Sequence, residues 1–468
     1  MQGKYTLFVP GTDHAGIATQ SVVEKNVWKN EGKTRHDYGR EAFVNKIWDW
    51  KEKHGNQILE QFRRIGNSFD WTHFTFTMDD ERSKAVTEAF VRLFDMGLIY
   101  RSNRLVNWSC KLQTGISDIE VDYKDLKEPT IMEVPGHSGK YEFGALTKFA
   151  YKVSGTEEEI VVATTRLETM LGDSAVAVNS KDPRYTHLVG KSLIHPFIPS
   201  RQMKVITDDV LVDMAFGTGA VKITPAHDYN DYECGIRNKL EIINVLAKDG
   251  TINGNGGKFA GKMRFDVRNE MLAELESLGL LRGKEPNEMR LGICSRSGDV
   301  IEPMIAPQWY MSTGEISKKM VEVVESKELK IVPSSYESIW FHWLRNSQDW
   351  CISRQLWWGH RCPAYLVEVN GKEGNPSKQE DFVVARSEEE AMEKAKAKYG
   401  EQASVKLIQD EDVLDTWFSS ALFPFSTVGW PDETKLSFKA FYPNTILETG
   451  HDILFFWVAR MVMMDCYC

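Results

Sequence analysis

Two short stretches between residues 159 and 231 place hydroxyls, cations and carboxylates directly after apolar, β-branched runs. One run ends in Thr164-Thr165-Arg166, and the other ends in Lys222-Ile223-Thr224 with Asp228 and Asp231 close behind. Each pattern is typical of a buried strand whose end delivers polar side chains into a turn. Two such ends side by side would form a polar pocket. Its carboxylates could hold an ammonium group, and its arginine and lysine could hold a phosphate or a ribose.

The alternative interpretation is structural, because threonines are common in strands and charged residues are common in turns. Each of these residues, taken singly, favours that alternative. The segment Phe216-Gly217-Thr218-Gly219, just before the second run, adds two glycines that permit a close backbone approach. The combination of polar strand ends and glycines favours a binding site.

Another polar turn follows the first apolar run, residues 5–9, which we expect to be a strand ended by Pro10-Gly11. Asp13 and His14 then lie at the carboxyl end of that strand, where open α/β sheets bind ligands. Asp13 could anchor an ammonium group, and His14 could act as a hydrogen-bond donor or a base. An N-cap role for Asp13, at the start of a helix near Ile17, is an equal alternative.

Near the other end of the chain, Gly450 and Asp452 form a Gly-x-Asp turn between an expected strand ending at Thr449 and an apolar helix over 454–464. The glycine would let a sugar approach the backbone, and the aspartate would accept hydrogen bonds from ribose hydroxyls. This turn is a weak signal of nucleotide binding by itself.

The elements around these turns change character along the chain. Helical spacing of apolar residues predicts helices over 36–65, from Asp79 to Gly97, and from Phe265 to Leu281, and Ile99–Trp108 predicts a strand. From about residue 127 to 257 the segments are short, β-branched and punctuated by glycines. This change indicates a strand-rich domain inserted between two halves of another domain.

Length and composition agree with a multidomain protein. At 468 residues the chain is too long for one compact core. A formal charge of −10 argues against a histone-like nucleic-acid binder, although local basic patches remain compatible with it. The seven cysteines include no C-x-x-C pair, so we expect no zinc site. No apolar run is long enough for a membrane span, so we expect no membrane partner.

The order of the motifs is more specific than any one of them. The segment Val9–Gln20 resembles the valine-binding segment of valyl-tRNA synthetases, which are class I aminoacyl-tRNA synthetases. The sister families for isoleucine and leucine typically have Gly-Trp-Asp where this chain has Gly11-Thr12-Asp13, which favours valine. Further matches follow in the family's order, from about Gly3 to Met464: Asn107–Cys110, Ala163–Arg166, Lys222–Asp228, Trp350–His360, Asp412–Ser420 and Glu448–Trp457.

The resemblance implies an α/β fold in which a Rossmann-type, parallel-sheet catalytic domain (1–127 and 346–468) is split by an inserted, strand-rich α/β editing domain with its linkers (128–345). It implies activation of valine with ATP and Mg²⁺, transfer to tRNA(Val), and a cytoplasmic location, with a mitochondrial one as the alternative. By position, the valine pocket is implied to contain Asp13, Trp417, Ile453 and Trp457, and the nucleotide site to contain Gly450 and Asp452.

The resemblance also implies a second pocket. An apolar valine pocket cannot strongly reject threonine, and valyl-tRNA synthetases are the known example of this limit. A polar editing pocket that hydrolyses misattached threonine is therefore implied, with Asp231 as our candidate for binding the ammonium group. No Ser–His or Cys–His dyad is visible, so we expect attack by an oriented water. The residues implied to form this pocket are Thr164, Thr165, Arg166, Thr169, Phe216, Lys222, Thr224, Asp228 and Asp231.

Within that pocket, Arg166 and Lys222 are implied to hold the tRNA end. The threonines and Asp228 are implied to contact the substrate hydroxyl or to position the water.

Two class I signatures are missing from the sequence. The His-x-Gly-His element is expected upstream of Val9, and the Lys-Met-Ser-Lys-Ser loop is expected downstream of Gly450. Their imidazoles and lysines stabilise charge on the phosphates of ATP. We therefore expect a chain truncated at both ends, with impaired synthesis of the adenylate. The alternative is a non-synthetic form that retains only editing hydrolase or tRNA-binding activity.

Overall fold

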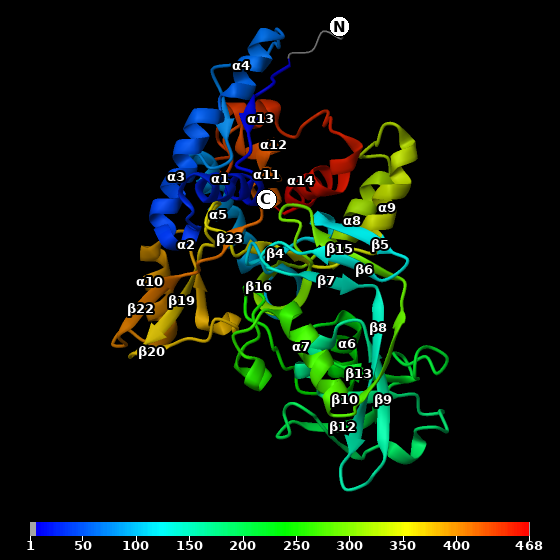
Figure 1. The fold of residues 1–468 in the computed structure, drawn as a ribbon. Helices are drawn as coiled ribbons and strands as arrows, with labels where there is room; N and C mark the ends of the chain where they lie inside the picture. Colours follow the sequence, from blue (N-terminus) through cyan, green and yellow to red (C-terminus); the bar gives the residue numbers. More distant parts are fainter. Residues whose placement is uncertain (1–5, 468) are drawn as a thin grey trace. The chain divides into compact units, whose positions relative to one another are not determined.

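The computed structural model describes residues 6–467 and separates into two compact units (Figure 1). One unit is discontinuous, Met1–Ser102 with Pro307–Cys468, and the other is continuous, Asn103–Ala306. The chain enters the continuous unit within β3 (Ile99–Ser109) and leaves it within β16 (Glu302–Met311). Both boundaries of the continuous unit therefore lie inside strands.

The continuous unit is built on a seven-stranded mixed sheet. Its order is β13-β10-β12-β11-β8-β14, with β9 paired to β8. The β10–β12 pair is parallel, and the other pairs are antiparallel. The strands are β8 (Ala145–Val153), β9 (Glu159–Thr164), β10 (Ala175–Val178), β11 (Ser192–Ile194), β12 (Gln202–Thr207), β13 (Ala220–Ile223) and β14 (Leu281–Pro286).

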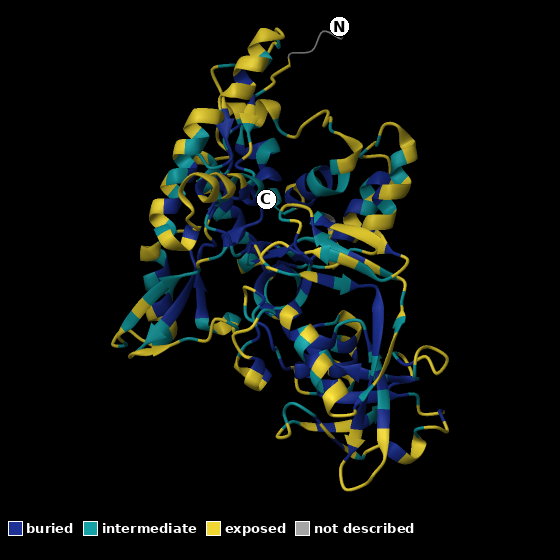
Figure 2. Ribbon diagram, viewed as in Figure 1, coloured by how far each residue is buried: buried dark blue, intermediate teal, exposed yellow. Residues whose placement is uncertain are grey.

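Helix α7 (Arg264–Ser277) packs on this sheet and closes the core of the unit. Its apolar residues at 267, 271 and 275 recur at helical spacing and are fully buried with Phe149 and Tyr151 of β8. Figure 2 shows α7 buried on one side and exposed on the other. The helix expected from Phe265, with its end at Gly279, is confirmed as α7, and Gly279 adopts φ 66° just beyond the last helical turn.

The discontinuous unit is largely helical. The helix predicted over 36–65 is present as α3 (Arg40–His54) and α4 (Gln57–Arg64), with a break near Gly55. The helix predicted from Asp79 is confirmed as α5 (Asp80–Asp95), and the Asp79 carboxylate caps it by accepting from the Arg82 N–H at 2.9 Å. The other main helices are α1 (Gly16–Glu31), α8 (Gly314–Glu325), α9 (Glu337–Arg345), α10 (Glu388–Tyr399), α11 (Thr416–Ser420) and α14 (Ala459–Asp465).

Two strands predicted in this unit are not formed as expected. The described part of the run 5–9 has no regular pairing, and Phe8 instead stacks on Phe69 at 4.3 Å. The strand begins later, as β1 (Gly11–Thr12), which pairs in parallel with β2 (Thr75–Phe76). Residues 446–449 are irregular, with Ile446 82% exposed, and no strand within residues 6–467 pairs with them. Within residues 6–467, no helix is long and apolar enough to cross a membrane.

Because Phe149 is fully buried in the sheet core, Phe149→Ala should lower the local free energy of unfolding of the continuous unit by about 3–5 kcal/mol. Hydrogen–deuterium exchange of peptides from β8 to β10 measures this change. The control Val210→Ala removes an 82% exposed side chain in the same unit and should change the value by less than about 0.5 kcal/mol. Equal effects of the two substitutions would contradict the assignment of the core.

Candidate functional site

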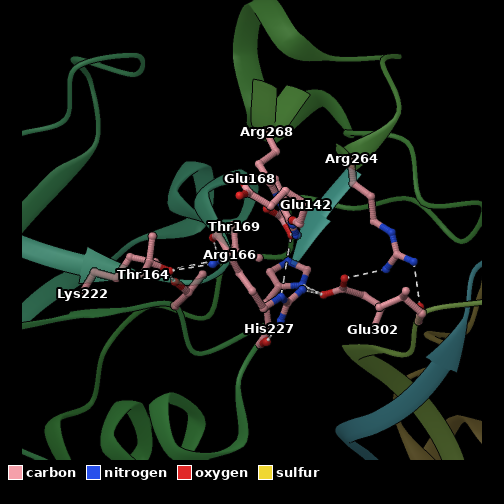
Figure 3. Close-up of polar contacts among 12 residues, drawn as sticks. Glu142, Thr164, Arg166, Glu168, Thr169, Lys222, His227, Arg264, Arg268 and Glu302 are labelled. Carbon is pink, nitrogen blue, oxygen red and sulfur yellow. Dashed lines mark hydrogen bonds and ion pairs between the residues drawn. The ribbon is translucent and has the colours of Figure 1, made fainter. Parts of the chain in front are cut away.

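The two polar strand ends lie together in the continuous unit, as the sequence predicts. Strands β9 and β13 are in contact. The short helix η2 (Leu167–Gly172) follows β9, and α6 (Tyr229–Asn238) begins shortly after β13. The segments 164–169 and 222–231 therefore meet, and Figure 3 shows their side chains converging.

Lys222 is buried and its charge is already compensated. Its Nζ donates to Asp173 Oδ1 at 3.1 Å, to Thr169 Oγ1 at 3.2 Å and to Thr224 Oγ1. The Thr224 hydroxyl donates in turn to Asp173 Oδ1 at 2.5 Å. Asp173 is fully buried and also accepts from the Tyr151 hydroxyl at 2.6 Å. Asp173 was missed in the sequence, where a single aspartate before a strand resembles an ordinary turn residue.

Arg166 is also paired within the protein. Its Nη1 donates to the main-chain oxygen of His227 at 2.6 Å, and its Nη2 donates to Glu302. Its Nε lies 3.8 Å from Glu168, which is held by both arms of Arg268 at 2.7 Å. About a quarter of the Arg166 side chain (24%) remains exposed.

Behind Arg166 lies a buried ionic group that the sequence did not reveal. Glu302 accepts from Arg166, from His227 Nδ1 at 3.2 Å and from Arg264 Nη1 at 2.7 Å. Burial opposes ionisation of Glu302, but Arg166, His227 and Arg264 outweigh it and hold the pKa of this carboxyl well below its usual range. The pattern Glu-Pro at 302–303 carries no functional signature, so no local signal identifies Glu302.

The two carboxylates at the start of α6 have different environments. Asp228 is the helix N-cap and accepts from the N–H groups of Asn230 at 2.8 Å and Asp231 at 3.1 Å. Asp231 is 8% exposed and accepts from the Thr224 N–H at 2.8 Å. Burial and the nearby Asp228 carboxylate raise the pKa of Asp231 to about 7. Asp231 is thus a desolvated carboxylate beside the pocket residues. The nearby charge of Lys222 lowers its pKa only in part, and Asp231 forms none of the direct ion pairs seen for Asp173 and Glu302.

The remaining predicted editing residues are divided. Thr164 is buried, and its Oγ1 accepts from the Arg166 N–H at 3.0 Å. Thr165 is half-buried next to it, and Thr169 donates to the Arg166 carbonyl oxygen at 2.9 Å. Phe216 is 65% exposed in the loop before β13, so its ring is not part of the buried cluster.

The residues predicted to bind valine are in the discontinuous unit, around α11. Asp13 Oδ1 accepts from the Ala15 N–H at 2.5 Å, and its Oδ2 accepts from the Ser420 hydroxyl. Trp457 Nε1 donates to the Ser420 carbonyl oxygen at 3.1 Å. Trp417 lies on α11, the helix that also carries Ser420, and its ring is 5.8 Å from that of Phe456.

Other polar groups at this end are arranged as follows. Ile453 is half-buried in η7 (His451–Ile453), which Gly450 precedes, while Asp452 in the same turn is exposed. His14 is buried, bonds Thr77 Oγ1 through Nδ1 at 2.8 Å, and has its pKa lowered by burial to about 4, so its imidazole is neutral. Across the described residues, no group of three or more histidines, cysteines and carboxylates could hold a metal ion.

Comparisons with known proteins identify relatives of the whole chain. The family model for class I tRNA synthetases (I, L, M and V) matches residues 1–467. A mitochondrial valine–tRNA ligase of Saccharomyces cerevisiae is 55% identical over 465 residues. Mitochondrial valine–tRNA ligase 1 of Arabidopsis thaliana is 57% identical over 472 residues, and a valine–tRNA ligase of Caenorhabditis elegans is 55% identical over 466. Each match covers 99% of this chain but 42%, 42% and 44% of the relative, so the chain spans less than half the length of these curated relatives.

Replacing Asp231 with asparagine should stabilise the protein more at pH 8 than at pH 5. Folding raises the pKa of this carboxyl from 3.8 to about 7, so the native state binds the extra proton and loses stability as pH rises between these values. Asparagine removes the buried charge, and the gain should be about 1–2 kcal/mol larger at pH 8 than at pH 5. Urea unfolding at the two pH values measures it. A pH-independent gain would show that Asp231 does not titrate in this range.

Removing the cation of the buried pair should be strongly destabilising. Lys222→Met leaves the Asp173 charge uncompensated and should lower the free energy of unfolding by about 3 kcal/mol. Adding Asp173→Asn should restore part of that loss, because the unpaired charge disappears. Urea unfolding of the single and double variants tests this, and strictly additive losses would rule out the pairing.

Proposed function

Because the chain belongs to the class I tRNA synthetases for isoleucine, leucine, methionine and valine, we propose that its activity is that of a valine–tRNA ligase with editing. The reaction is ATP-dependent activation of valine and transfer to tRNA(Val), together with hydrolysis of threonyl-tRNA(Val). Relatives at 55–57% identity carry the name valine–tRNA ligase, which supports valine as the amino acid. Gly11-Thr12-Asp13 supports the same choice.

The proposed architecture is a Rossmann-type catalytic domain split by an inserted editing domain. The continuous unit, enclosed in sequence by the two parts of the discontinuous one, supports this division. The parallel pairing of β1 with β2 directly before Asp13 supports a ligand site at the carboxyl end of that strand.

In the synthetic site, Asp13 would hold the valine ammonium group, with its carboxylate oriented by Ala15 and Ser420. Trp417, Ile453 and Trp457 would shape the apolar side-chain pocket. ATP, carrying Mg²⁺ on its phosphates, is the expected second substrate, and Gly450 and Asp452 would contact its adenosine. The exposed position of Asp452 supports access of a ribose.

The observation that carries the editing proposal is Asp231, a desolvated carboxylate beside a cluster of threonines. Ionised Asp231 would bind the ammonium group of the misattached threonine, because burial strengthens its attraction for a cation. Thr169 and Thr224 already bind Lys222. Thr164 and Thr165 would therefore be the threonines that contact the substrate hydroxyl and the attacking water. Water then adds to the ester carbonyl, and the bond between that carbon and the ribose oxygen breaks. Threonine leaves with the water oxygen, and a proton from the water restores the ribose hydroxyl of the tRNA.

The other editing residues support this geometry. Lys222 would orient Thr169 and Thr224. Arg166, whose exposed part remains available, would contact the tRNA end. Asp228, as the N-cap of α6, would fix the start of the helix that carries Asp231.

The test is deacylation of threonyl-tRNA(Val) by this chain, measured beside valine-dependent ATP–pyrophosphate exchange. We expect hydrolysis, and a loss of about 10-fold or more in Asp231→Asn, equivalent to about 1.4 kcal/mol of lost ammonium binding. The control Glu233→Gln removes an exposed carboxylate from the same helix and should leave the rate unchanged.

A folded wild-type chain that leaves the threonyl ester intact would overturn the editing proposal. Hydrolysis at the wild-type rate by Asp231→Asn would overturn the role of Asp231 alone. Hydrolysis without pyrophosphate exchange would favour the alternative activity, an editing hydrolase that does not synthesise the adenylate.

A further inference from the structure

We infer that Glu302 is a positioning residue of the editing pocket. It orients Arg166 towards the substrate and does not itself contact the substrate. The inference rests on the proposed editing function. Glu302 is the first residue of β16, is 1% exposed, and lies far in sequence from both segments that form the pocket. Figure 3 shows it between Arg264 and the pair formed by Arg166 and His227.

Both oxygens of Glu302 are used. Oε1 accepts from Arg166 Nη2 and from His227 Nδ1 at 3.2 Å, while Oε2 accepts from Arg264 Nη1 at 2.7 Å. The pairing with two guanidinium groups keeps this carboxylate charged in spite of its burial. A charged acceptor between two arginines fixes each of them more firmly than a neutral group would.

His227 reinforces the same arrangement. Its Nε2 accepts from the Val245 N–H at 3.1 Å, so the ring proton is on Nδ1 and points to Glu302. Its main-chain oxygen accepts from Arg166 Nη1 at 2.6 Å. Glu302, His227 and Arg166 therefore form a closed triangle of hydrogen bonds. Because both ring nitrogens are bonded, His227 has no free nitrogen to act as a base.

Glu302, and not Glu168, is the carboxylate that fixes the position of the Arg166 guanidinium group. Glu168 is bound by both arms of Arg268 at 2.7 Å and lies 3.8 Å from Arg166 Nε. The contact of Arg166 with Glu302 is direct, and together with the His227 oxygen it occupies both terminal nitrogens. Because these bonds already fix its rotamer, Arg166 loses little conformational entropy when it contacts the tRNA end. Less of the binding free energy is then spent on ordering this side chain.

The test is a double-mutant cycle between Glu302→Gln and Arg166→Ala. The readouts are threonyl-tRNA(Val) deacylation and calorimetric binding of 3′-(threonylamino)-3′-deoxyadenosine, a non-hydrolysable amide mimic of the charged tRNA end. If Glu302 acts through Arg166, Glu302→Gln should weaken binding and slow deacylation 5- to 20-fold in the wild-type background. In the Arg166→Ala background the same substitution should change either value less than 2-fold.

The matched control is Asp299→Asn. Asp299 is a buried carboxylate that also contacts Arg264, at 3.3 Å, and it binds the Lys111 N–H at 2.9 Å. This substitution perturbs the same ionic group without touching Arg166, so it should lower the melting temperature and leave binding and deacylation within 2-fold of wild type. If Glu302→Gln does not fold, Glu302→Asp is the second variant. Aspartate keeps the negative charge, but its oxygens lie one methylene farther from Arg166, so it should show the same loss.

The inference would be overturned by equal losses from Glu302→Gln in both backgrounds, or by a folded Glu302 variant that binds the mimic as the wild type does. In either case, hydrolysis of the ester by the wild type would still support the editing function. A wild-type chain that neither binds the mimic nor cleaves the ester would overturn the function and the inference together.

Discussion

The compensation of buried charge is the constraint on which the continuous unit depends. Arg166, Lys222 and Arg264 are cations that are largely buried. Burying any of them without a carboxylate partner would lower the stability of the folded unit by several kcal/mol. Glu302 and Asp173 remove that penalty. They also join the two strand ends to α7, β8 and β16, because their partners come from all of these elements.

This compensation changes the interpretation of the pocket. The sequence suggests that Arg166 and Lys222 are free cations awaiting an anionic ligand, but both already have carboxylate partners. The charge of Lys222 therefore serves to orient threonine hydroxyls. Under the proposed function, Arg166 meets the tRNA end as a group already fixed by Glu302 and His227. The carboxylate that is least compensated is Asp231, because burial and the neighbouring Asp228 raise its pKa more than the charge of Lys222 lowers it. A site that keeps one desolvated carboxylate gives up stability in exchange for affinity towards a cation.

The carboxylate proposed for the synthetic site differs from Asp231 in its hydrogen-bond donors. Asp13 receives two donors, the Ala15 N–H and the Ser420 hydroxyl, and a third of its side chain is exposed. Burial nevertheless raises the pKa of Asp13 to about 6, and the hydrogen bonds from Ser420 and Ala15 offset only part of this rise. Under the proposed function, each of the two pockets binds the ammonium group of an amino acid with an aspartate. The synthetic pocket is apolar around the amino-acid side chain, and the editing pocket is lined by hydroxyls. This difference suits the separation of valine from threonine.

The sequence alone determined the family, through the order of its motifs, and located two polar strand ends, because alternation and β-branching mark strands locally. It also determined α5, whose cap lies within three residues of its partner. It did not determine the strands around residues 5–9 and 446–449, since a strand requires a neighbour that local pattern does not specify. The partners of the pocket cations were decided by tertiary structure. Arg166 and Glu302 are 136 residues apart, and His227 and Glu302 are 75 apart, so nothing in either local sequence records the contact. Burial then converts these contacts into the electrostatics of the site, and burial is a property of the folded chain.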